Sequence, residues 1–333
     1  MRDLIRAVTQ LAADHEFTAF QNDLVRHAYQ ALGQGYSSNE NEVQLVTGLV
    51  KSLRGNSHGP LSVFADKIHG TASWVEFDYM DKPTTKELGD MAVITTVTRQ
   101  RERLFQRLCV IQNKKRGPTG WAVDQEQLYL LKNFPPFAGN KGIFKNCRDV
   151  AFRNESGCLG AYGLLHARGE MVFASGPLVA ELLRGRKSLP ESDVALVEAT
   201  IGPFSHQVGG AFPFGGPSCR IHPREWFHLC EMFAHEFGWP FLFGHGVGRW
   251  LGNAVFGRDL YDFVRLWTQL NIGEVTYAFG EVANAPVDAF ANVLLRRIGL
   301  GDVFDMPSDQ FAELEFESEM GILALHFDVG RME

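Results

Sequence analysis

The sequences ELGDMAVI at residues 87–94 and LCVIQNKK at residues 108–115 decide how this chain folds. Each is an apolar, β-branched run typical of a buried strand, and each contains polar side chains that such a strand rarely carries. These side chains are Asp90 in the first run, and Gln112 and Lys114 in the second. Because side chains alternate along a strand, Gln112 and Lys114 leave the same face. We therefore expect Asp90 to join them if the two strands lie side by side.

Length and composition favour an intracellular globular protein. The 333 residues are 45% hydrophobic, which is enough for a large core, and the length favours two domains. No run of roughly 18 apolar residues predicts a membrane span. Charged residues interrupt the amphipathic N-terminal segment, which is not typical of a signal peptide. We expect a cytoplasmic protein without membrane contacts.

The cysteines favour reduced thiols over a disulfide framework. They are odd in number and scattered, most of them among apolar residues, and no two have the CxxC spacing of a structural zinc site. Their positions are Cys109, Cys147, Cys158, Cys219 and Cys230.

Charge is distributed unevenly along an acidic chain. The net charge of −7 does not by itself indicate a nucleic-acid-binding protein. Within residues 99–116, however, only Glu102 opposes a run of basic residues, namely Arg99, Arg101, Arg103, Arg107, Lys114, Lys115 and Arg116. Further basic residues follow at Lys141, Lys145, Arg148 and Arg153. Two interpretations stay open: a local positive field that meets a polyanion, or a solvated hairpin tip.

Hydrophobic periodicity predicts an α/β arrangement for the first half. Residues 1–35 are predicted to form two helices that end at Gly33 to Gly35, and Ser37 to Asn39 offer N-caps for the next helix. Residues 81–85 are predicted to form a loop. The order of the remaining elements is helix, strand, strand, strand, helix, at residues 40–53, 74–79, 89–97, 108–115 and 124–133. This order is typical of a mixed sheet covered by helices.

Two acids stand at the start of the helix over residues 40–53. Glu42 lies on its inward side, one turn before the first buried residues, and Glu40 lies nearer the cap. Either acid would complement the helix dipole. An acid on an inward face, however, needs a partner.

The second half predicts an α+β domain of unrecognised type. Residues 159–165 and 171–174 read as a hairpin, Pro177 opens a short helix that Gly185 closes, and residues 202–218 read as a packed loop. Further helices are predicted at about residues 223–237, 259–270 and 286–298. No structure is assigned to the last stretch, up to Phe327.

The combination of Glu42, Asp90 and Gln112-x-Lys114 resembles the PD-(D/E)xK nuclease superfamily, whose fold is restriction-endonuclease-like. That family has an acid on its first core helix, an Asp on one strand, and an acid-x-Lys pair on the next. The resemblance covers about residues 37–150 and implies three parts: an N-terminal helical preface (1–35), a nuclease domain (36–150) and a C-terminal domain (151–333) of unknown role. The spacing Gln125-x-x-x-Tyr129 on the following helix is similar to the Gln/Tyr motif of the family's exonuclease branch.

The chain departs from the family at Gln112, where an acid is usual. A carboxamide oxygen can still bind Mg²⁺, which prefers oxygen ligands, but it contributes no negative charge. The resemblance therefore implies a weaker metal site, whose charge comes from Asp90 and from Glu42, with Glu40 as the other candidate for the helix acid.

The resemblance implies Mg²⁺-dependent hydrolysis of phosphodiesters, with Mn²⁺ as a substitute. The metal ligands would be Asp90, Glu42 and Gln112, and Lys114 would orient or deprotonate water or neutralise developing charge. The substrate would be nucleic acid, with DNA expected, in bacterial restriction or anti-phage defence. The residues expected to contact it are Lys115, Arg116, Gln125 and Tyr129.

The alternative is a catalytically inactive module on the same fold. It would bind nucleic acid or a protein partner within a larger complex, and Gln112 would mark the lost chemistry. In either case the C-terminal domain could contact a protein partner or a second copy of the chain.

Overall fold

A computed structural model describes residues 15–68, 74–141, 144–145, 147–166, 169–195, 256–300 and 320–332. The loop predicted at residues 202–218 and the helix predicted at residues 223–237 lie outside the described residues, as does the start of the N-terminal preface. No described helix is long and apolar enough to cross a membrane.

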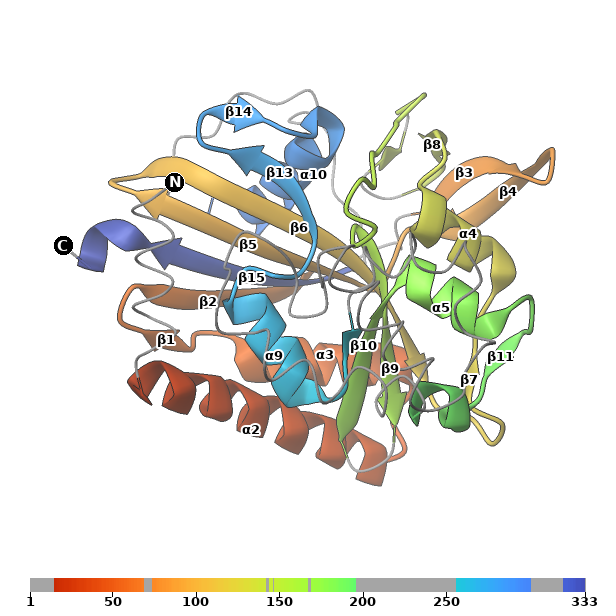
Figure 1. The fold of residues 1–333 in the computed structure, drawn as a ribbon, viewed down its shortest axis with the longest axis horizontal. Coiled ribbons are helices and arrows are strands. Elements are labelled where there is room, and N and C mark those ends of the chain that lie inside the picture. Colours follow the sequence, from red (N-terminus) through yellow and green to blue (C-terminus); the bar gives the residue numbers. More distant parts are fainter. Residues whose placement is uncertain are drawn as a thin grey trace, which may run out of the picture.

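A mixed sheet of ten strands forms the centre of the molecule (Figure 1). Its main order is β1 (Ser57–His58), β2 (Leu61–Ile68), β15 (Met320–Asp328), β5 (Met91–Arg99), β6 (Glu102–Lys115), β9 (Gly160–His166), β10 (Glu170–Ser175) and β12 (Phe256–Gly257). In addition, β13 (Glu274–Ala278) pairs with β6 and with β14 (Glu281–Val282). Strands β5 and β6 form an antiparallel hairpin, which confirms the predicted pairing. On either side of this hairpin the sheet continues with a parallel strand, β15 next to β5 and β9 next to β6.

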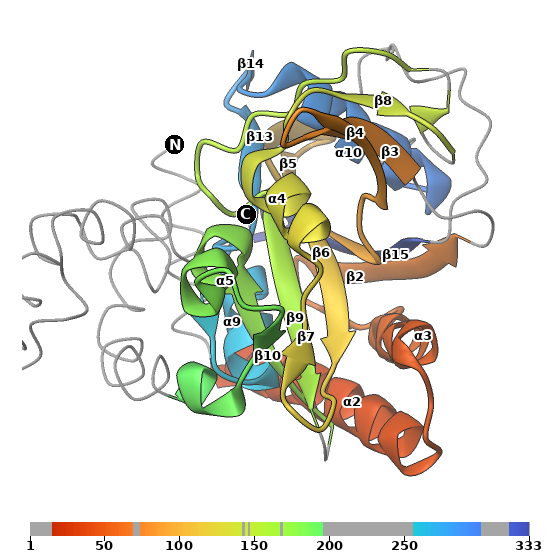
Figure 2. The ribbon, with the colours of Figure 1, turned by 90° about the vertical axis from the view of Figure 1, so that its right-hand side faces the viewer.

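Helices cover both faces of this sheet (Figures 1 and 2). One face packs against α2 (His15–Ser37), α3 (Glu42–Leu53) and α9 (Leu260–Thr268), and the other against α4 (Gln125–Asn133), α5 (Gly176–Leu183) and α10 (Ala285–Arg297). Each face of the sheet has its own hydrophobic core, and the side chains of β6 alternate between the two: Val110 lies in one, and its neighbours Cys109 and Ile111 lie in the other. The prediction of an α/β protein with a mixed sheet is confirmed at this level.

A smaller sheet lies beside the main one. It has the order β4 (Lys82–Glu87), β3 (Trp74–Tyr79), β8 (Phe137–Gly139). The strand predicted at residues 74–79 is therefore present, with Val75 and Phe77 buried, but it belongs to this sheet. The loop predicted at residues 81–85 is wrong beyond the turn residue Asp81, because residues 82–85 belong to β4 and pair with β3 at the edge of the small sheet. Short strands β7 (Trp121–Ala122) and β11 (Ser188–Leu189) pair elsewhere.

The sequence predicted that the N-terminal helix ends at Gly33 to Gly35, but the helix continues past these glycines. Helix α2 continues to Ser37. A Cβ atom on Gly35 would lie 2.5 Å from Glu40 Oε2 and 2.6 Å from Leu45 Cδ2, so this glycine allows α2 and the start of α3 to approach each other. The N-cap of α3 is Asn41 rather than a residue at 37–39, and a capping box joins Asn41 to Gln44.

Other predicted elements are confirmed. Asp124 caps α4 by accepting from the amides of Glu126 and Gln127, and the β9–β10 hairpin leads into α5 with Pro177 in its first turn. Helices α9 and α10 match the predictions at 259–270 and 286–298. The unassigned C-terminal stretch contains β15, a central strand, and a short 3₁₀ helix, η2 (Val329–Met332), follows this strand. The boundary predicted near residue 150 falls between strands of one sheet.

Arg103, one of the basic residues counted near the hairpin, is buried rather than presented to a polyanion. It makes two hydrogen bonds with Asp288 of α10, at 2.8 and 2.9 Å, and a third with Asn292 at 2.9 Å. Gln106 and Thr276 also donate to Asp288, at 3.1 and 2.9 Å. This bidentate, fully bonded pair fixes α10 on the sheet and sets α10's register against β6.

Candidate functional site

Asp90 directly precedes β5, and its backbone is hydrogen-bonded to the neighbouring strands on both sides. Its amide donates to the carbonyl of Ile111 in β6 at 3.0 Å, and its own carbonyl accepts from the amide of Gly321 in β15 at 2.8 Å. The preceding Gly89 permits this close approach, since a Cβ atom there would lie 2.6 Å from Val110 Cγ1 and 3.2 Å from the Ile111 carbonyl oxygen. The carboxylate is thus placed by the central strands of the sheet.

The Asp90 carboxylate bonds directly to β6. Its Oδ2 accepts from Gln112 Nε2 at 2.6 Å and from the backbone amide of Asn113 at 2.7 Å. The predicted meeting of Asp90 and Gln112 is confirmed. A carboxylate oxygen only accepts, so the amide nitrogen of Gln112 is the donor and its Oε1 takes no part in this hydrogen bond. That Oε1 is buried and has no hydrogen-bond partner.

The surroundings disfavour the charge on Asp90. Burial is the main cause and raises the pKa of this carboxyl from 3.8 to about 6, and the nearby charge of Glu42 acts in the same direction. The Asn113 amide, Lys114 and Gln112 lower the pKa, but they do not offset the burial. A cation bound beside this carboxylate would stabilise its ionised form.

Lys114 and Glu42 complete the group. Lys114 Nζ lies 3.6 Å from Glu42 Oε2, with 23% and 38% of the two side chains exposed. The charges of both act on Asp90. Of the two candidate helix acids, Glu42 therefore faces the site, whereas the backbone carbonyl of Glu40 accepts from Lys115 Nζ at 2.7 Å. The first turn of α3 supplies Glu42 to the end of the sheet where β5 begins and β6 ends.

These donors fit a hard divalent cation. The set consists of the carboxylates of Asp90 and Glu42 and the unpartnered Oε1 of Gln112, all of them oxygen atoms, as Mg²⁺ prefers. In the described ranges no three histidine, cysteine, aspartate or glutamate side chains gather as a metal site would require. Gln112 is the reason that this group contains only two carboxylates.

The basic residues predicted to contact nucleic acid have partners within the chain. Lys115 lies over the ring of Tyr36, 5.2 Å from its centroid, and donates to the loop between α2 and α3. Arg116 forms an ion pair with Glu191 at 2.5 Å, with 37% of its side chain exposed. Contact of either residue with nucleic acid stays a prediction.

The two residues predicted from the following helix face in different directions. Gln125 Nε2 donates to the carbonyl of Arg186 at 2.6 Å. Tyr129 packs against Phe77 and Tyr79 of the small sheet, with ring centroids 6.2 and 5.2 Å apart. The sequence analysis missed Gln127, whose Nε2 donates to the carbonyl of Glu87 at 2.5 Å and ties α4 to the segment before Asp90.

Tyr162 of β9 is a second residue that the sequence analysis missed. It lies opposite Gln112 in the parallel register of β6 and β9, it is fully buried, and its hydroxyl has no hydrogen-bond partner. One signal was present in the sequence, because this tyrosine is the single polar side chain in the run from Gly160 to Leu165. The register that places it beside Gln112 could not be read from that run.

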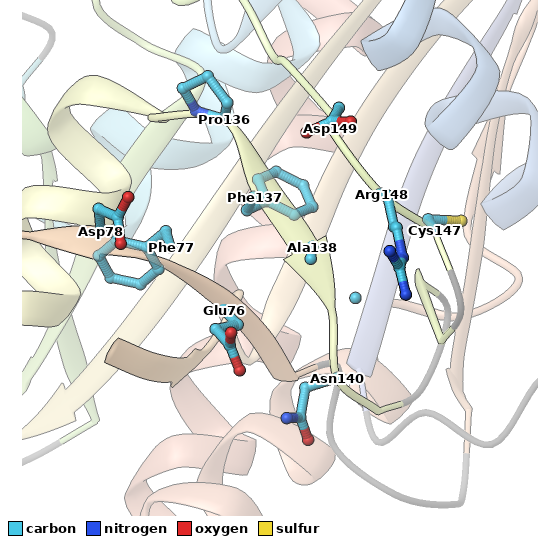
Figure 3. A pocket seen from close by; sticks show the side chains of 11 residues that line it. Glu76, Phe77, Asp78, Pro136, Phe137, Ala138, Asn140, Cys147, Arg148 and Asp149 are labelled. Carbon is cyan, nitrogen blue, oxygen red and sulfur yellow. The ribbon is translucent and has the colours of Figure 1, made fainter. Parts of the chain in front are cut away.

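A hollow of about 620 Å³ lies away from this group, over the small sheet. Side chains of β3, β8 and residues 147–149 line it, among them Glu76, Asp78 and Arg148 (Figure 3). None of the residues predicted for the nuclease site reaches it. It is a separate feature of the surface.

No protein-family model, curated protein or solved structure matches this chain. The site is therefore defined by its own geometry.

Proposed function

We propose that this protein is a Mg²⁺-dependent phosphodiesterase that hydrolyses DNA. The observation that carries the proposal is the hydrogen-bonded pair of Asp90 and Gln112 beside Lys114 and Glu42, at one end of a mixed sheet. Because the pKa of Asp90 is raised, a bound cation would stabilise its ionised carboxylate. The resemblance to PD-(D/E)xK nucleases supports the same reaction and suggests a role in bacterial defence.

In this proposal Asp90, Glu42 and the Oε1 atom of Gln112 hold the cation. Bound Mg²⁺ would supply a more acidic water and neutralise phosphate charge. The hydrogen bonds from Gln112 and the Asn113 amide fix the Asp90 carboxylate, so that it need not reorganise when substrate binds. Lys114, paired with Glu42, brings its ammonium group to the same place, where it can orient the attacking water or neutralise the charge on the phosphate.

The test is cleavage of supercoiled plasmid by the purified full chain with Mg²⁺ or Mn²⁺. We expect nicking that disappears in Asp90→Ala and Lys114→Ala and is strongly reduced in Glu42→Ala. Glu40→Ala is the matched control for Glu42, because it removes the neighbouring acid whose carboxylate is not paired with Lys114. Lys51→Ala, on an exposed position of α3, is the control for Lys114. Cleavage that survives both Asp90→Ala and Lys114→Ala would exclude this site.

The alternative is a binding module without catalysis, and one observation favours it. Among the residues that the structure describes, two carboxylates serve the site, and one of them is already paired with Lys114. The module predicts retained DNA binding, with no cleavage of plasmid, single-stranded DNA or RNA under either metal. The same set of substrates distinguishes a DNA nuclease from an RNA nuclease.

A further inference from the structure

Two buried polar atoms on neighbouring strands lack hydrogen-bond partners, on the face of the sheet that packs against α4, α5 and α10. Gln112 in β6 and Tyr162 in β9 are paired in register, and both continue the face that Val110 and Leu164 bury. Oε1 of Gln112 and the hydroxyl of Tyr162 are each without a hydrogen bond, so they do not bond to each other. A hydrogen-bond donor and an acceptor thus stand side by side, unpaired, next to Asp90.

Leaving such atoms unpaired is costly. A buried polar group without a partner costs about 1–3 kcal/mol, and phenylalanine would fill the space of Tyr162 without that cost. The ring of Tyr162 alone would serve the core, which already includes Leu130, Leu164 and Val172. The hydroxyl is therefore not explained by packing.

The hydroxyl remains a proton donor. Burial, and then the charges of Asp124 and Asp90, hold the pKa of Tyr162 well above its ordinary value. Full burial also decides what it can meet, because Tyr162 has no exposed surface for a nucleotide to touch. A small hydrated ion beside Asp90 is the ligand that fits.

We infer that Tyr162 is a positioning residue of the cation site, whose hydroxyl donates a hydrogen bond to a water of the divalent ion held by Asp90, Gln112 and Glu42. The inference rests on the proposed function. Tyr162 touches no substrate in it and acts only through the ion's water shell, as outer-shell groups of metal sites do.

The test compares wild type with Tyr162→Phe by Mn²⁺ titration without DNA, followed by electron paramagnetic resonance or calorimetry. We expect the variant to bind Mn²⁺ about 10-fold more weakly, while its melting temperature in EDTA is equal to or above that of wild type. A tyrosine retained for structure alone would give the opposite pair of results. The control is Tyr29→Phe, which removes the hydroxyl of an exposed tyrosine on helix α2 and should leave Mn²⁺ affinity unchanged.

The outcomes separate the two proposals. If wild type binds no Mn²⁺, the metal site itself fails. If wild type binds Mn²⁺ and Tyr162→Phe binds it equally well, only the role of Tyr162 is overturned. A crystal structure of wild type with Mn²⁺ decides the question without any variant: the Tyr162 hydroxyl either lies within hydrogen-bond distance of a water on the ion, or the inference is wrong.

Discussion

Gln112 Nε2 donates a 2.6 Å hydrogen bond to Asp90 Oδ2, and this contact joins the beginning of β5 to the end of β6. The amide replaces the acid that stands at this position in the family the sequence resembles. Gln112 stabilises the metal-free protein, because an acid at this position would repel Asp90 instead of donating a hydrogen bond to it. The cost is a smaller negative charge for binding a cation.

Gln112→Glu should exchange stability for metal affinity. The new carboxylate no longer donates to Asp90 and lies beside it, so we expect the metal-free protein to lose about 1–3 kcal/mol of unfolding free energy. Mn²⁺ affinity should rise by about 10-fold through the added charge. Urea denaturation in EDTA and Mn²⁺ titration measure the two effects. Gln112→Met is the control that removes the same donor without adding charge, and it should weaken both properties.

Asp90→Asn should stabilise the metal-free protein while abolishing cleavage. With its pKa near 6, the ionised carboxylate costs the folded state free energy at neutral pH, and the asparagine can still accept from the Asn113 amide. We expect a gain on the order of 1–2 kcal/mol, less than the full shift implies because a neutral carboxamide accepts weaker hydrogen bonds from Gln112 and the Asn113 amide than the carboxylate does. Equilibrium denaturation in EDTA measures it. A loss of stability would mean that Asp90 is a structural residue.

Gly89→Ala should disturb the site without touching its side chains. The added methyl group would meet Val110 and the Ile111 carbonyl, so residue 89 must move away from β6 and take Asp90 with it. We expect reduced Mn²⁺ affinity and a loss of about 1–3 kcal/mol of stability from overpacking. Gly48→Ala on α3, where nothing lies within 4 Å of the added atom, is the control: it should preserve Mn²⁺ affinity and should not lower stability, since alanine favours the helix.

Asp288→Ala should destabilise the protein strongly. It leaves the buried Arg103 guanidinium without its carboxylate, a change that costs about 3–5 kcal/mol. The double variant Arg103→Met/Asp288→Leu should lose clearly less than the sum of its single changes in urea denaturation. Additive losses would show that the two residues act independently. Asp23→Ala breaks an exposed ion pair with Arg26 and should cost less than about 1 kcal/mol.

Stability should fall in mild acid because of His326. Burial, the main cause, lowers the pKa of His326 in the folded state, where its ring bonds Thr98 Oγ1 at 2.7 Å. Asp328 raises this pKa and Arg331 lowers it. The unfolded chain takes up the proton near pH 6.5, so the stabilisation is complete above about pH 6.5 and is lost as the pH falls below it. Unfolding free energies of wild type and His326→Gln between about pH 8 and 5 should converge at the acidic end.

Local patterns predicted what local interactions decide. Asp124 capped its helix as expected, and the period-two alternation placed Gln112 and Lys114 on the face that Asp90 reaches. Residues 81–85 were predicted as a loop because the edge strand β4, which contains residues 82–85, tolerates Pro83 and charged side chains that a central strand does not.

The remaining differences come from pairings between distant residues. Strand β15 lies between β2 and β5, although more than 200 residues separate it from either in sequence, and no local period encodes that position. The same applies to Tyr162, whose role depends on which residue of β6 it faces. Gly35 was predicted to end a helix. Its role is instead to let α3 approach α2, and this is a tertiary contact that the local sequence does not reveal.

The position of β15 also bears on how the protein is made. Until residues 320–328 have left the ribosome, β2 and β5 lack the strand between them, and Asp90 lacks the backbone partner that Gly321 supplies. A growing chain therefore cannot complete the proposed cation site before β15 has been synthesised. The proposed activity would then appear only some time after residues 42–114, which carry its side chains, have been made.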